Sequence, residues 1–236
     1  MQTMNLAIIT GASVGIGKAS AQQFIERDFA VYNLSRRACS VPGVHNICCD
    51  LSDDHDVHQA GEQLRAAAER ATTVALVHNA CQMRKDSADN CKSDSLRAVL
   101  ETNLVAINSL NQLLLPVIKT GSSVIYVGST LSEKAVPGSF SYVVSKHALA
   151  GMMKASCQDL MGSGIHTALI CPGFTDTEML RTHLGDDPDA LASVAGLNSF
   201  GRLIEPEEIA DLIVWAHHNP VINGGIMHAN LGQREA

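Results

Sequence analysis

Tyr142 and Lys146 lie four residues apart in the segment FSYVVSKHAL and are the clearest candidates for chemistry in this chain. Residues at this spacing share one face of a helix, so the phenol and the ammonium group can meet. Tyrosine is a proton donor at neutral pH, and a nearby cation stabilises its phenolate. The alternative is an ordinary helix surface, because this spacing arises often by chance. The surrounding elements decide between these interpretations.

Short apolar runs alternate with helical patterns along the whole chain. The apolar runs predict strands at 6–10, 30–35, 44–49, 74–78, 123–127, 165–171 and 225–229. Helical patterns cover about 16–27, 58–70, 95–118 and 206–218, and a further helix carries the Tyr142/Lys146 pair. Several strands are apolar on both faces, as in buried parallel sheets. We therefore expect one α/β domain over residues 1–236, a Rossmann-type doubly wound parallel sheet of about seven strands with helices on both faces.

A glycine-rich segment leads directly from the first strand into the first helix. It reads TGASVGIG from Thr10 to Gly17. Glycines here allow a tight turn and close approach to a pyrophosphate, and the helix N-terminus offers backbone donors. A dinucleotide site is therefore predicted, with contacts from Gly11, Ser13, Val14, Gly15, Ile16 and Gly17. The spacing TGxxxGIG resembles that of the short-chain dehydrogenase/reductase family.

The end of the second strand indicates which nicotinamide cofactor is used. NAD sites commonly have an acidic residue there for the adenosine ribose, whereas this chain has Ser35-Arg36-Arg37. An arginine can pair with a 2′-phosphate, so NADP(H) is favoured over NAD(H), with Ser35 and Arg36 as contacts and Arg37 in reserve. The alternative is that the arginines are solvated surface charges. Asp50-Leu51 resembles the family's adenine contact, although Asp50 is also a candidate N-cap of the next helix.

The resemblance assigns a catalytic set. Ser129 ends the strand SVIYV, Tyr142 and Lys146 form Tyr-xxx-Lys, and Asn103 in TNLVA matches a fourth member. The family's chemistry implies Tyr142 as general acid/base, Ser129 and Tyr142 as substrate contacts, and Lys146 as the group that holds the nicotinamide ribose and lowers the pKa of the tyrosine. Asn103 would hold a water next to Lys146. Its alternative role is to cap or kink a helix.

Two further segments resemble family motifs around the nicotinamide. Asn79 and Ala80 in VHNAC match the family's Asn-Asn-Ala-Gly, whereas His78 and Cys81 depart from it. We still expect cofactor contacts from Asn79, Ala80 and Cys81. The segment after the sixth strand adds expected contacts from Pro172, Gly173 and either Thr175 or Thr177.

Residues 174–200 form a connection that is too long for a tight turn. The run DDPDA inside it predicts a turn. Long connections of this kind are commonly lids or binding loops, so this is the expected substrate loop. Its apolar residues suggest a partly apolar pocket with Phe174 as a substrate contact. The alternative is that they pack the loop itself.

The composition of the chain limits the partners and the cellular compartment that we expect for it. Apolar residues make up 46% and charged residues 17%, and a net charge of −7 without a basic block argues against nucleic-acid or membrane partners. Seven cysteines without CxxC spacing fit a reducing cytoplasm, and no signal peptide is evident. His55 and His58 lack a third ligand nearby, so no metal site is expected.

The resemblance implies an NADP(H)-dependent oxidoreductase that transfers hydride reversibly between nicotinamide C4 and a small-molecule carbonyl or secondary alcohol. A non-catalytic NADP(H)-binding sensor or scaffold is the alternative, which the intact Ser129–Tyr142–Lys146 set disfavours. A third option keeps the fold with altered chemistry, as in epimerases. Family members are commonly dimers or tetramers, so a homodimer or homotetramer is expected.

Overall fold

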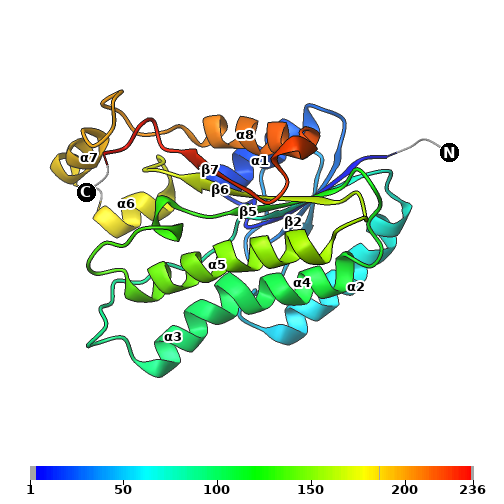
Figure 1. Cartoon of the computed structure of the whole chain (residues 1–236), viewed down its shortest axis with the longest axis horizontal. Coiled ribbons are helices and arrows are strands. Elements are labelled where there is room, and N and C mark those ends of the chain that lie inside the picture. Colours follow the sequence, from blue (N-terminus) through cyan, green and yellow to red (C-terminus); the bar gives the residue numbers. More distant parts are fainter. Residues whose placement is uncertain (1–3, 186, 235–236) are drawn as a thin grey trace.

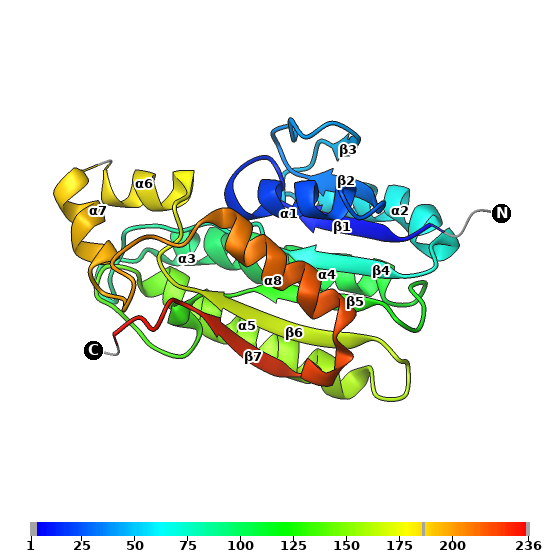
Figure 2. The same ribbon diagram turned by 90° about the horizontal axis from the view of Figure 1, so that it is seen from above.

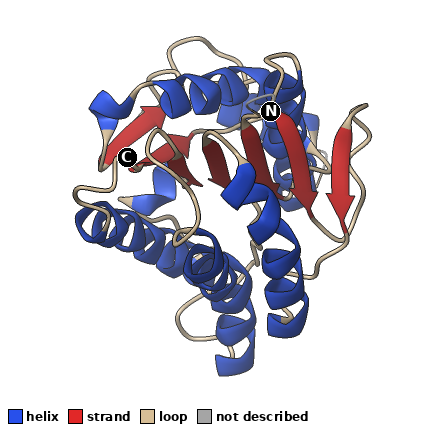
Figure 3. Cartoon of the chain, turned by 90° about the vertical axis from the view of Figure 1, so that its right-hand side faces the viewer, coloured by secondary structure: helices blue, strands red, loops and turns tan. Residues whose placement is uncertain are grey.

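Seven parallel strands form a single sheet in the computed structural model, which describes residues 4–185 and 187–234. The strand order is β3-β2-β1-β4-β5-β6-β7 (Figure 2), and helices lie on either side of the sheet (Figures 1 and 3). The strands are β1 (Leu6–Thr10), β2 (Ala30–Leu34), β3 (Val44–Ile47), β4 (Val74–His78), β5 (Ser123–Val127), β6 (His166–Pro172) and β7 (Gly225–Ala229). Because consecutive parallel strands need crossover connections, the helices lie on both faces of the sheet. The predicted doubly wound α/β fold is confirmed.

Each face of the sheet has its own apolar core. On one face α1 (Gly15–Ile25) and α8 (Pro206–His218) cover Ala7 and Ile9 (Figure 2). On the other face Leu6 and Ile8 pack in the core formed with α2 (Asp54–Arg70), α4 (Ala106–Leu114) and α5 (Phe140–Asp159). Successive strand residues point to opposite faces, which explains why the central strands are apolar throughout. None of the described helices is long and apolar enough to cross a membrane.

The helix expected over 95–118 is interrupted. The chain forms α3 (Ser93–Leu100), a π-helical turn at Glu101–Val105, and then α4. Asn103 lies in that turn, where its side chain is buried and bonded to the loop after β4 and to Ser145 of α5. Such turns insert an extra residue and occur frequently at functional sites. The alternative interpretation of Asn103 as a kink residue is therefore the one that describes its local structure.

The connection between β6 and α8 is also more regular than expected. It contains two short helices, α6 (Glu178–Leu184) and α7 (Pro188–Ala195), which lie together at one end of the sheet (Figure 2). Thr177 caps α6 by accepting from Leu180 N at 3.3 Å, and Asp187 caps α7 by accepting from Asp189 N at 3.0 Å. The predicted turn DDPDA includes residue 186, which lies outside the described residues. The segment expected as a lid is thus partly helical rather than an irregular loop.

Candidate active site

A cavity of about 1020 Å³ opens beyond the carboxyl ends of the strands. In the sheet order β2-β1-β4 the connections diverge on either side of β1, and ligands bind at such switch points in doubly wound sheets. Segments following β1, β2, β4, β5 and β6 line the cavity together with α6. The expected contacts found in its wall are Gly11, Ser13, Val14, Gly15, Ile16, Ser35, Arg36, Asp50, Leu51, Asn79, Ala80, Cys81, Tyr142, Lys146, Pro172 and Thr177.

The glycine-rich loop is held tightly against the end of β4. Gly11 has a φ of +72°, and a Cβ there would lie 2.9 Å from Ala80 Cβ. A Cβ on Gly17 would lie 2.3 Å from Gly11 O, so Gly17 is required beneath the loop and does not line the cavity. Asn79 Nδ2 donates to Thr10 O at 3.0 Å and to Gly11 O at 3.1 Å. This loop can therefore bring the start of α1 close to a pyrophosphate, as a dinucleotide requires.

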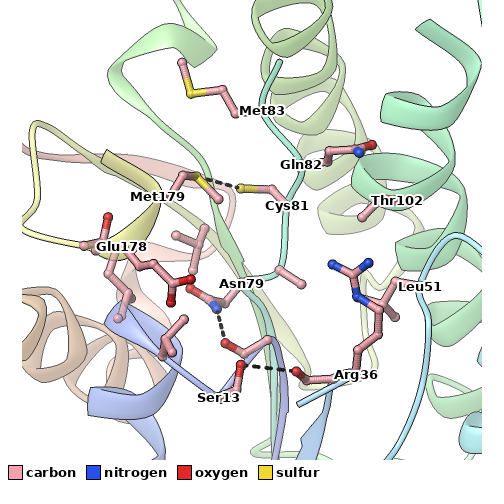
Figure 4. A pocket seen from close by; sticks show the side chains of 18 of the residues that line it. Ser13, Arg36, Leu51, Asn79, Cys81, Gln82, Met83, Thr102, Glu178 and Met179 are labelled. Atoms are coloured by element: carbon pink, nitrogen blue, oxygen red, sulfur yellow. Dashed lines mark hydrogen bonds between the residues drawn. The ribbon is translucent and has the colours of Figure 1, made fainter. Parts of the chain in front are cut away.

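The residues after β2 occupy the opposite end of the cavity from the catalytic pair. Ser35 Oγ lies 3.3 Å from Ser13 Oγ, next to the glycine-rich loop. Arg37 forms two contacts of 3.2 Å with Glu178 of α6. Arg36 lines the cavity beside Leu51 and has no ion pair within the described part of the chain (Figure 4). Of the two arginines, Arg36 is thus the one available for a ligand anion.

Asp50 does not cap the next helix, contrary to one of its two expected roles. Asp53 is the N-cap of α2, with its side chain accepting from His55 N and Asp56 N. Asp50 Oδ1 instead accepts from Ser52 N at 3.0 Å and Ser52 Oγ at 2.7 Å. These hydrogen bonds lower the pKa of the Asp50 carboxyl, with a further contribution from the Arg36 charge. Asp50 therefore forms a local turn in the cavity wall.

Ser129, Tyr142 and Lys146 meet at the other end of the cavity. Tyr142 and Lys146 line it from α5, and the Lys146 Nζ atom lies 5.5 Å from the centroid of the Tyr142 ring. Ser129, next to the lining residue Gly128, forms a hydrogen bond that acts to lower the pKa of Tyr142. The Ser129 side chain also accepts from Leu131 N at 3.1 Å, which fixes its orientation. The three side chains predicted as a set are therefore brought together.

The protonation of Tyr142 differs from the expectation. Burial raises its pKa well above the usual value, and the neighbouring Cys81 thiol acts in the same direction. Lys146 Nζ donates to Val127 O at 2.7 Å, so its charge is directed towards a backbone carbonyl. The protein's own groups thus keep Tyr142 protonated, which makes it a proton donor. The expected lowering of this pKa does not arise from Lys146 in the protein alone.

Asn103 connects the segment after β4 to α5, the helix that carries Tyr142 and Lys146. Its Oδ1 atom accepts from Gln82 N at 2.7 Å, and its Nδ2 atom donates to Gln82 O at 2.9 Å. Its amide also donates to Ser145 Oγ at 2.9 Å, beside Lys146. Asn103 is 2% exposed and does not line the cavity. In this geometry it ties the loop after β4 to the helix that carries Tyr142.

The segment after β6 separates its expected contacts. Pro172 and Thr177 line the cavity, whereas Thr175 is buried and its hydroxyl donates to Gly173 O at 3.1 Å. Thr177 is therefore the better placed of the two threonines. Gly173 packs against the C-terminal segment, where a Cβ would lie 3.0 Å from Asn230 Cα.

The expectation that Phe174 contacts substrate is not supported by its position. Phe174 is absent from the cavity lining, and its carbonyl accepts from Ile204 N at 2.9 Å. Met179 and His183 of α6 line the cavity in its place. The lid residues that face the site are therefore those on α6, one turn apart.

Several lining residues were not singled out from the sequence. Gln82, Met83, Arg84 and Lys85 continue the wall after Cys81, and Thr102 lies beside Gln82 (Figure 4). Cys81 Sγ lies 4.0 Å from Met179 Sδ, so the β4 segment and the lid meet across the cavity. The sequence could have indicated the residues after β4 only through their position, because residues directly after a central parallel strand lie at the ligand-binding edge of the sheet.

Three features occur together in this structure: a glycine-rich loop of the dinucleotide-binding type, a cavity at the switch point of the sheet, and a Ser–Tyr–Lys set. This combination defines a nucleotide-binding α/β oxidoreductase. Residues 11–233 match the family model described as Enoyl-(Acyl carrier protein) reductase. The chain belongs to the short-chain dehydrogenase/reductase family.

Known relatives agree with this assignment. The chain is 27% identical over 229 residues to Carbonyl reductase family member 4 of Xenopus tropicalis, covering 93% of each chain. It is 29% identical over 244 residues to the 3-oxoacyl-[acyl-carrier-protein] reductase FabG of Salmonella typhimurium, covering 96% of each. Among solved structures it resembles the Pseudomonas aeruginosa RhlG/NADP active-site complex, with a TM-score of 0.87, 25% identity, and coverage of 98% of this chain and 96% of that one.

Proposed function

We propose that this protein is an NADP(H)-dependent carbonyl reductase acting on a small-molecule ketone or aldehyde. The observation that carries the proposal is the Ser129–Tyr142–Lys146 set at one end of a cavity whose other end holds Arg36 and the glycine-rich loop. The nicotinamide, when bound, supplies the hydride to the carbonyl carbon. The carbonyl reductase and 3-oxoacyl reductase relatives support this direction of the reaction.

Tyr142 would donate its phenolic proton to the substrate oxygen as that oxygen gains negative charge. Burial raises the pKa of Tyr142, so the phenol is protonated and ready to donate at neutral pH. Ser129 would donate a hydrogen bond to the same oxygen and stabilise its developing charge. Lys146 would move from Val127 O to the ribose hydroxyls, and its cation beside Tyr142 would then stabilise the phenolate left by proton transfer. Solvent would return the proton to the tyrosine.

The preference for NADP(H) rests on charge at the adenosine end. No carboxylate stands at the end of β2, and Arg36 lines the cavity without an ion pair among the described residues. Arginine binds phosphate through charge-assisted hydrogen bonds, which NAD(H) cannot offer at the ribose 2′ position. The structural relative solved as an NADP complex supports the same cofactor.

We further infer a cytoplasmic homo-oligomer. All seven cysteines are free thiols, which fits a reducing compartment. Val105 and Val144 are 42% and 36% exposed on the helices that hold Asn103 and Tyr142, where a second copy could cover them. Size-exclusion chromatography with light scattering tests the assembly.

Replacing Tyr142 with phenylalanine tests the proposed function. NADPH oxidation over a panel of ketones and aldehydes is the assay. Loss of a general acid is expected to lower kcat by about 10²- to 10⁴-fold, because the ring is kept while the proton is removed. Tyr32→Phe, on β2 away from the cavity, is the matched control and should react as the parent does. Equal turnover by Tyr142→Phe would remove the proposed role of Tyr142, whereas a parent that reduces no member of the panel would favour the sensor over the enzyme.

A further inference from the structure

Two basic residues stand together at the substrate end of the cavity. Arg84 and Lys85 follow β4 and line the cavity beyond Cys81. His183, from the facing helix α6, lines the same cavity and lies close enough to Lys85 for the lysine charge to act on it. These residues come from segments about 100 positions apart, so the sequence shows no basic run at either place. We call Arg84, Lys85 and His183 the basic rim.

The position of the basic rim separates it from the cofactor's phosphates. Arg36 and Met83 lie at opposite ends of the cavity, with Cys81 and Met179 between them (Figure 4). The residue after Lys85, Asp86, pairs with Ser139 at the start of α5, three positions before Tyr142. A smaller groove continues past Lys85 and His183 to Pro137 and Gly138. The basic rim therefore lies at the same end of the cavity as Tyr142 and away from the glycine-rich loop and Arg36.

The two cations of the basic rim are not held in ion pairs. Neither Arg84 nor Lys85 forms an ion pair or a side-chain hydrogen bond within the ranges that the structure describes. The two carboxylates that line the cavity are held elsewhere, since Asp50 is bonded to Ser52 and Glu178 to Arg37.

Asp86 is the nearest carboxylate and is already engaged. Although burial opposes it, hydrogen bonds from Ser141 lower the pKa of Asp86, which is 8% exposed. Its charge contributes to the structure of α5 and reaches Arg84 only at a distance beyond an ion pair. Like charges placed together without a partner repel each other and favour the arrival of an anion.

We propose that the substrate is an anionic carbonyl compound, whose ketone lies at Ser129 and Tyr142 and whose carboxylate or phosphate is bound by Arg84 and Lys85. This inference rests on the proposed function and names its substrate class. The stretch between the two ends is lined by Cys81, Met83 and Met179, which suits a short hydrocarbon segment. Straight-chain oxo acids and straight-chain oxoalkyl phosphates meet all three requirements.

The test uses a series of straight-chain oxo acids in which the carboxylate stands progressively further from the ketone. Each acid is compared with its neutral methyl ester. A second arm compares straight-chain oxoalkyl phosphates with the corresponding oxo alcohols, which lack the phosphate. We expect kcat/KM to favour the anion in at least one arm, and the favoured arm identifies the anion. Arg84→Gln should reduce that preference by about 10- to 100-fold and Lys85→Gln by a smaller factor, because Lys85 is exposed.

Matched controls remove a charge outside the site. Arg65→Gln on α2 and Lys154→Gln on α5, both exposed, should leave the preference unchanged. The two control variants should also react with neutral substrates as the parent does. Added salt should lower turnover of the anionic substrates alone. Esters and acids reduced equally well, with ratios unmoved by Arg84→Gln and Lys85→Gln, would overturn the inference while leaving the Tyr142 assignment intact.

A binding measurement decides the inference independently of turnover. Isothermal titration of each hydroxy acid and its methyl ester into the enzyme with NADPH should give tighter binding of the acid, and Arg84→Gln should abolish the difference. Equal binding of acid and ester in every pair would also overturn it. Failure of the proposed function looks different, since Tyr142→Phe would then match the parent whatever the acid-to-ester ratio.

Discussion

Tyr142 is protonated because of where its ring lies. Burial raises its pKa, and Cys81, where the family usually has glycine, adds to that effect from the end of β4. A tyrosine in this state carries its proton at neutral pH, as a general acid must before it donates, and the raised pKa also makes it a weaker acid than a free tyrosine. The sequence predicted that Ser129, Tyr142 and Lys146 would meet. It could not predict the direction of the pKa change, because burial depends on segments that only the fold brings together.

Arg36 gives a prediction that belongs to one side chain. Arg36→Ala should lower the NADPH-to-NADH ratio of kcat/KM by about 10- to 100-fold, because a charge-assisted contact with the 2′-phosphate is worth roughly 1.5–3 kcal/mol. Steady-state kinetics with both cofactors measures the ratio. Arg65→Ala, on the exposed face of α2, is the control and should leave it unchanged. An unaltered ratio in Arg36→Ala would assign the phosphate to other groups.

At the scale of elements, regular segments were predictable where local signals agree. The bounds of β4, β5, β7 and α8 match the sequence-based prediction to the residue, because uninterrupted apolar or amphipathic runs end at polar residues or begin at proline. The π-helical turn around Asn103 was not predictable, since its hydrogen bonds reach Gln82 and Ser145, 21 and 42 positions away. Helices α6 and α7 were missed because each spans about two turns and depends on its caps at Thr177 and Asp187.

The ion pair between Arg37 and Glu178 joins the end of β2 to the lid helix α6 across the cavity. Both side chains are more than half exposed, so the pair contributes at most about 1 kcal/mol to stability. Glu178→Gln should leave the melting temperature nearly unchanged. It should tighten NADPH binding about two- to fivefold and NADH binding less, because it frees Arg37 and removes an anion from the cavity wall.

Fluorescence titration of each nucleotide measures this effect, and Glu62→Gln, which changes an exposed residue of α2, is the control. Weaker NADPH binding in Glu178→Gln would show that closing the lid through this pair matters more than the freed cation. Equal changes for NADPH and NADH would show that Arg37 has no part in reading the 2′-phosphate.

At the scale of the whole molecule, two buried histidines link the sheet to its flanking helices. His78, at the end of β4, bonds Asn111 of α4 at 2.9 Å, and burial lowers its pKa to about 4. His217 of α8 bonds Ser123 of β5 at 2.8 Å, and burial lowers its pKa to about 3. Both imidazoles are therefore neutral in the folded protein at pH values where an unfolded chain, with a histidine pKa near 6.5, is already protonated.

Stability should consequently fall as the solution is acidified below pH of about 6.5. Each histidine whose folded pKa is depressed makes the unfolded state bind one more proton in this range, which costs about 1.4 kcal/mol per pH unit. The two together predict a slope that approaches roughly 2.7 kcal/mol per pH unit between about pH 6 and pH 5, and carboxylates whose folded pKa is lowered, such as Glu208, add to it below about pH 5. Urea unfolding at a series of pH values measures it. His78→Asn should halve the slope, whereas His58→Asn, on the exposed surface of α2, should not change it. A stability that stays flat across this window in the parent would mean that the buried rings take up protons without unfolding, and that the two cores open locally before they separate.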